Sequence, residues 1–158
     1  MTIMRHVLHI MTLTVVMILI SLWYAIQAAI VLSIVLAVLF GELGTILYAM
    51  YLLVFLLILP MIPLAGIIGL ILGMVTVIEF RHIVNANHYR EHMNRWVMGI
   101  PFTFGSLAYG LVIITSEGTT IETLAIITLA IVLYAFICTR AGKAAINWYA
   151  DIMENETN

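Results

Sequence analysis

Residues 7–40 read VLHIMTLTVVMILISLWYAIQAAIVLSIVLAVLF and contain no formally charged side chain. Residues 45–78, TILYAMYLLVFLLILPMIPLAGIIGLILGMVTVI, form a second stretch of the same kind. An apolar stretch of about 20 residues is enough for a helix to cross the hydrocarbon core of a bilayer. Two much longer stretches therefore predict a helical protein of the membrane.

The composition of the whole chain agrees with this prediction. The protein has 158 residues, of which 65% are hydrophobic and 9% are charged. Soluble domains carry about 25% charged residues, so this chain has too few charges to cover a surface that faces water. We expect an all-α integral membrane protein that forms a single domain over residues 1–158. Its single cysteine, Cys138, excludes an intrachain disulfide and any metal motif of several cysteines.

Polar breaks divide the chain into four predicted spans. Two glycines bracket Glu42, and residues 116–120 read SEGTT, so both places are turn signals. The long polar connection covers residues 80–95, and a polar tail covers residues 141–158. The predicted fold is a four-span transmembrane helix bundle with spans at about 10–40, 45–79, 96–115 and 121–140.

The first two spans are longer than a bilayer requires. Residues 7–40 would extend roughly 51 Å as a straight helix at 1.5 Å per residue, whereas the hydrocarbon core is about 30 Å thick. We expect a long, tilted first span. Pro60 and Pro63 lie near the middle of the second span and remove backbone donors, which predicts a kink there. A re-entrant pair of half-helices is the alternative.

The basic residues set the predicted orientation. In the four-span topology all of them fall on one side of the membrane: Arg5, Arg81, Arg90, Arg95, Arg140 and Lys143. Segments rich in Lys and Arg usually stay in the cytoplasm. We therefore expect cytoplasmic N- and C-termini, with the plasma membrane as the location. The short turns, which carry Glu42, Glu117 and Glu122 instead, are predicted to lie outside.

Small side chains at every fourth position predict close helix packing. The first span has a ridge of such residues: Ser21, Ala25, Ala29, Ser33, Ala37 and Gly41. They share one helix face and let a neighbouring backbone approach closely. Gly69 and Gly73 repeat the spacing in the second span, and Ser106 and Gly110 repeat it in the third. The ridge predicts either packing within the monomer or an interface between subunits.

A polar stripe is predicted in the connection between the second and third spans. If residues 80–96 are helical, one face carries Arg81, Asn85, His88, His92 and Arg95. Cationic side chains at the membrane surface favour an anionic headgroup or an acidic partner. His88 and His92 are four residues apart, which suits a metal, and residues 88–92 match the H-x-x-E-H string. No third ligand is evident, so we predict no metal site, with these two histidines as the alternative ligands.

These patterns favour association over chemistry. No Asp, Glu, Lys or Arg lies deep in a predicted span, which argues against an autonomous ion pump. No catalytic set, phosphate-binding loop or dinucleotide motif is evident. We expect no enzyme activity, no cofactor and no nucleic-acid partner. The expected function is helix association, either with other membrane subunits as an accessory component or in a homo-oligomer.

Two alternatives remain open at this point. The first is an oligomeric channel or transporter component. The second is a membrane metalloenzyme that uses the cytoplasmic histidines, which are His6, His9, His82, His88 and His92.

Overall fold

The computed structural model describes residues 2–40, 43–79, 86–115 and 120–157. They fold into four helices: α1 (Thr2–Phe40), α2 (Leu43–Glu79), α3 (Ala86–Thr115) and α4 (Ile121–Thr157). Each helix is long and apolar enough to cross a membrane. The predictions of an all-helical fold and of four long apolar helices are therefore confirmed.

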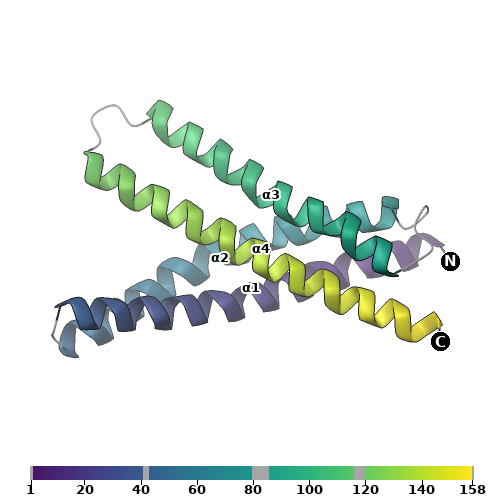
Figure 1. The fold of residues 1–158 in the computed structure, drawn as a ribbon, viewed down its shortest axis with the longest axis horizontal. Coiled ribbons are helices and arrows are strands. Elements are labelled where there is room, and N and C mark those ends of the chain that lie inside the picture. Colours follow the sequence, from purple (N-terminus) through teal and green to yellow (C-terminus); the bar gives the residue numbers. More distant parts are fainter. Residues whose placement is uncertain (1, 41–42, 80–85, 116–119, 158) are drawn as a thin grey trace.

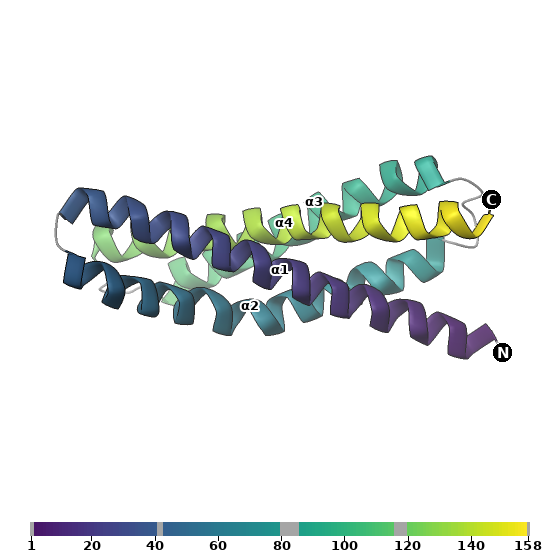
Figure 2. The ribbon, with the colours of Figure 1, turned by 90° about the horizontal axis from the view of Figure 1, so that it is seen from below.

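The helices form two antiparallel hairpins that cross (Figures 1 and 2). In the first hairpin α1 and α2 lie side by side along their length, and in the second α3 packs against α4. Both chain termini lie at one end of the bundle, which we call the terminal end. At the other end the α3–α4 hairpin diverges from the α1–α2 hairpin (Figure 1). The second hairpin therefore contacts the first mainly through the half of the bundle nearer the terminal end.

The helix α1 begins at Thr2, before the predicted start of the first span at about residue 10. Two further helices extend beyond the predicted spans. α3 begins at Ala86, so the described part of the predicted connection is helical and continuous with the third span. α4 continues through the predicted tail to Thr157. The two extensions meet at the terminal end, where Arg90 of α3 forms an ion pair with Asp151 of α4. Polar side chains at the ends of both helices thus pair with each other.

α2 runs as one helical element through both of its prolines. Because Pro60 has no N–H, the carbonyl oxygen of Leu56 loses the donor that a helix normally supplies four residues later. In this protein the hydroxyl of Tyr134, on α4, donates to that carbonyl oxygen at 2.5 Å. A side chain of the second hairpin thereby replaces a backbone donor missing from the first.

The core contains side chains from all four helices. Leu13, Met17, Met61 and Val97 are at most 1% exposed, and Ile146 is fully buried. The outer surface is also apolar. It carries large exposed side chains such as Leu19, Phe102 and Ile114. An apolar surface this continuous is unusual for a soluble monomer.

Candidate functional site

A polar cluster joins all four helices at the terminal end. The hydroxyl of Thr76 on α2 lies 2.9 Å from the hydroxyl of Tyr89 on α3. Thr76 donates its single proton to the carbonyl oxygen of Leu72 at 2.7 Å, so it accepts the proton of Tyr89. The hydroxyl of Tyr149 on α4 lies 2.7 Å from Nδ1 of His9 on α1.

The rings of Tyr89 and Tyr149 connect these two hydrogen bonds. Their centroids are 6.0 Å apart and their planes are inclined by 52°, which is a favourable aromatic geometry. Tyr89 is fully buried, Thr76 is 1% exposed and Tyr149 is 4% exposed. The cluster therefore holds the terminal end together with polar groups that have partners. Local sequence patterns did not predict that these four residues meet, because they lie on four different helices.

An ion pair lies beside this cluster, closer to the surface. The guanidinium of Arg90 contacts the carboxylates of Asp151 and Glu154, the latter at 3.5 Å. It also donates to the side-chain carbonyl of Asn87 at 3.0 Å. Because both carboxylates are well exposed, these contacts orient the ends of α3 and α4 more than they stabilise the fold.

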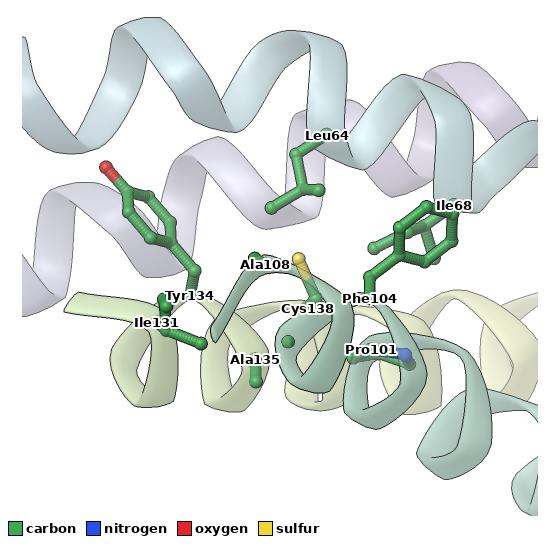
Figure 3. A pocket seen from close by; sticks show the side chains of 10 residues that line it. Leu64, Ile68, Pro101, Phe104, Ala108, Ile131, Tyr134, Ala135 and Cys138 are labelled. Carbon is green, nitrogen blue, oxygen red and sulfur yellow. The ribbon is translucent and has the colours of Figure 1, made fainter. Parts of the chain in front are cut away.

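Nearer the middle of the bundle, a cavity of about 200 Å³ lies between α2 and the α3–α4 hairpin (Figure 3). We call it the lateral cavity. Three helices line it, and the lining side chains are almost entirely apolar: Leu64 and Ile68 of α2, Pro101, Phe104, Gly105 and Ala108 of α3, and Ile131, Tyr134, Ala135 and Cys138 of α4. It is a hydrocarbon-lined space without the convergent polar groups that a catalytic pocket needs.

The predicted ridge on α1 lies mostly inside the bundle. Ser21, Ala25 and Ala29 are fully buried, Ser33 is 1% exposed, and Ala37 is half-buried. Gly41 lies outside the described residues. The hydroxyl of Ser33 donates to the carbonyl oxygen of Ala29 at 2.6 Å. The described ridge therefore faces other helices of the same chain.

Gly69 and Gly73 of α2 lie directly against the backbone of α1. A Cβ atom built at Gly69 would lie 2.9 Å from Cα of Thr14, and one at Gly73 would lie 3.0 Å from Cα of Ile10. Because these contacts are to backbone atoms, a methyl group at either position would require α1 or α2 to shift. The two glycines thus set the close approach of the first hairpin.

A second small-residue face, on α3, has no partner helix within the described chain. Gly99, Thr103 and Ser106 are exposed and Gly110 is half-buried. A Cβ atom built at Gly99 or Gly110 would meet no atom outside its own helix within 4 Å. The spacing of four residues predicted Ser106 and Gly110, and a spacing of four, three and four residues adds Gly99 and Thr103. We call these four residues the α3 small-residue face.

The predicted His and Arg stripe is only partly described. Arg81 and Asn85 lie outside the described residues. His88 and Arg95 are exposed and His92 is half-buried. The rings of His88 and His92 have centroids 6.1 Å apart. Among the described residues, no three His, Cys, Asp or Glu side chains lie close enough together to hold a metal ion.

These features define a class of fold: an all-helical chain of two hairpins, with four helices each long and apolar enough to span a membrane. No protein family model, curated protein or solved structure matches this chain.

Proposed function

We propose that this chain is a four-span integral membrane protein that acts by helix association, as an accessory subunit of a membrane complex or as a homo-oligomer. The apolar outer surface supports insertion, because large side chains such as Phe102 and Ile114 face outward where lipid would solvate them. The proposal includes the plasma membrane as the location, cytoplasmic termini, a tilted first span and a bend of α2 at its prolines.

The α3 small-residue face is the observation that carries the association proposal. In lipid the hydrophobic effect provides little driving force for helices to associate, so association depends on close packing and on interhelical hydrogen bonds. Small residues permit both because they let two backbones approach. The ridge of α1 and the glycines of α2 already pack within the monomer. Among the described residues, the α3 small-residue face remains available to receive a helix from another chain.

The hydroxyls of this face have local partners. Thr103 donates to the carbonyl oxygen of Gly99 at 2.8 Å, and Ser106 donates to that of Phe102 at 2.9 Å. The face is therefore ready to pack without leaving unsatisfied donors. Such a surface suits a subunit that binds other helices and performs no chemistry itself.

Substitution of Gly110 with Leu tests this function. Leu is a better helix former than Gly, so the monomer should keep its fold. The bulky side chain should hold a partner helix away and reduce the association constant about tenfold, which corresponds to about 1.4 kcal/mol. Self-association is measured by energy transfer between labelled chains in liposomes, and partner binding by co-purification in mild detergent.

The matched control is Ala125→Leu, an exposed position on α4. It should leave both measurements unchanged. If the unsubstituted chain is monomeric and carries no partner, or if Gly110→Leu associates normally, the association proposal is wrong.

A further inference from the structure

The lateral cavity is closed on its inner side and reaches the surface on its outer side. Ile68 and Cys138, which line it, are 1% exposed, whereas Phe104 is 38% exposed. Ala108 is also exposed. The cavity therefore passes from the side of the bundle into its interior, between α2 and the second hairpin.

Polar atoms contribute very little to this space. The hydroxyl of Tyr134 is turned toward α2 (Figure 3), where it donates to the carbonyl oxygen of Leu56. The sulfur of Cys138 points toward Leu64 in the same view, and a thiol is only a weak hydrogen-bonding group. A buried water needs two to four polar partners, and apolar cavities of roughly 150 Å³ stay dry yet bind benzene or xenon. The chemistry of the lateral cavity therefore selects hydrocarbon.

Small residues form part of the cavity wall on the side of the second hairpin. They come from both of its helices and are Gly105, Ala108 and Ala135. A Cβ atom built at Gly105 would lie 3.4 Å from a methyl group of Ile131, so α3 and α4 are in contact beneath the cavity. The opening lies between α2 and this floor.

The position of the opening identifies the source of the occupant. Each lining residue lies in a stretch that is long and apolar enough to span a membrane. If the protein is inserted as proposed, the side of the bundle at this level faces the acyl chains of the bilayer. We propose that the lateral cavity binds one acyl chain of a membrane phospholipid, seated between α2 and the α3–α4 hairpin. This inference rests on the proposed membrane insertion.

Photo-cross-linking with a lipid of defined chemistry tests the proposal. The purified full-length protein is titrated in detergent with a phosphatidylcholine that carries a diazirine in one acyl chain, irradiated, and mapped by peptide mass spectrometry. We expect labelling that saturates at one lipid per chain and maps to the lining residues of α3 and α4. Labelling that never saturates and spreads over exposed positions of all helices would overturn the proposal.

Two variants fill the cavity and one matched variant leaves it unchanged. Ala135→Leu and Ala108→Leu add bulk at lining positions, and Ala125→Leu adds the same bulk at an exposed position of α4 outside the lining. The two filling variants should lose the saturable label while Ala125→Leu keeps it. Ala108 is exposed, so its variant tests the site even if Ala135→Leu does not fold. Retention of the label in a folded filling variant contradicts the proposal.

Two further arms separate the causes of a negative result. A free fatty acid with the same diazirine chain is titrated in parallel, and saturable labelling by the free acid alone would overturn the phospholipid as the source. Alkaline extraction of membranes tests insertion independently. Release of the protein by alkali would overturn the membrane proposal and this inference together, whereas a retained protein without a saturable label would overturn the acyl-chain site alone.

Discussion

The hydroxyl of Tyr134 on α4 donates to the carbonyl oxygen of Leu56 on α2 at 2.5 Å, and so links the two hairpins. That carbonyl lacks its usual helical donor because the residue four positions later is Pro60. Inside a bilayer, where water is absent, an unpaired backbone carbonyl is costly. The pair therefore explains how α2 tolerates a proline near its middle, and it fixes one contact between the two hairpins.

Removal of the Tyr134 hydroxyl should destabilise the protein through this one contact. Tyr134→Phe keeps the ring and leaves the Leu56 carbonyl without its donor, so we expect the free energy of unfolding to fall by about 1 kcal/mol. Thermal unfolding in detergent measures the change. Tyr109→Phe, at an exposed position of α3, is the control and should have no effect.

A second substitution tests the cause of that loss. Pro60→Ala supplies an N–H four residues after Leu56, which can restore the helical hydrogen bond. Tyr134→Phe should therefore cost less in the Pro60→Ala background than in the original chain. Equal losses in the two backgrounds would show that the tyrosine acts by some other contact.

The close approach of α1 and α2 should depend on Gly69. A methyl group at this position would lie 2.9 Å from Cα of Thr14, and backbone atoms cannot move aside as a flexible side chain can. We expect Gly69→Ala to cost about 1–3 kcal/mol of stability by overpacking. The measurement is again thermal unfolding in detergent.

Gly99→Ala is the matched control for this overpacking. A Cβ atom at Gly99 meets no atom outside its own helix within 4 Å, and alanine is the better helix former by up to about 1 kcal/mol. This variant should be as stable as the original chain or more so. A Gly69→Ala protein with unchanged stability would mean that the two helices are farther apart than the structure shows.

Sequence patterns predicted the fold class because hydropathy and turn signals are local. The unbroken apolar stretch of residues 7–40 and the glycines around Glu42 needed no knowledge of the neighbouring helices. Contacts between helices are different, because they depend on the register of one helix against another. Pro60 reveals from sequence that a carbonyl lacks its donor, but nothing local identifies Tyr134 as the group that replaces it.

The same difference between local sequence signals and contacts between helices applies to the candidate sites. Gly69 and Gly73 follow a simple spacing and were selected from sequence. Gly99 and Thr103 continue the Ser106 and Gly110 pattern at a mixed spacing of three and four, so the sequence contains this signal, but spacing alone does not show that the face is exposed. The partners Thr76 and Tyr89 are polar residues on different helices, and only the structure brings them to 2.9 Å.

The polar cluster at the terminal end should stabilise the contact between the hairpins. Tyr89→Phe removes the hydroxyl that bonds to Thr76 and keeps the ring contact with Tyr149. We expect a loss of about 0.5–1.5 kcal/mol in the free energy of unfolding. Hydrogen exchange should report the change at the terminal ends of α2 and α3 more than at their opposite ends.

Thr76→Val removes the other half of the same hydrogen bond. Because the two substitutions break one interaction, the double variant should be less destabilised than the sum of the single variants. Strictly additive losses would show that the two hydroxyls do not interact in the folded protein.

The proposed orientation has a direct test by cysteine labelling. The background is Cys138→Ala, which removes the single native thiol. Glu91 lies on the part of α3 near the terminal end, and Glu122 lies at the start of α4 at the opposite end, and both are exposed. In the predicted topology the described basic residues lie on the same side of the membrane as Glu91, and basic segments are retained in the cytoplasm.

On intact cells a membrane-impermeant maleimide should therefore label Glu122→Cys, and should label Glu91→Cys only after permeabilisation. Labelling of Glu91→Cys from outside intact cells would reverse the orientation, and labelling of both variants from the same side would rule out the four-span crossing itself.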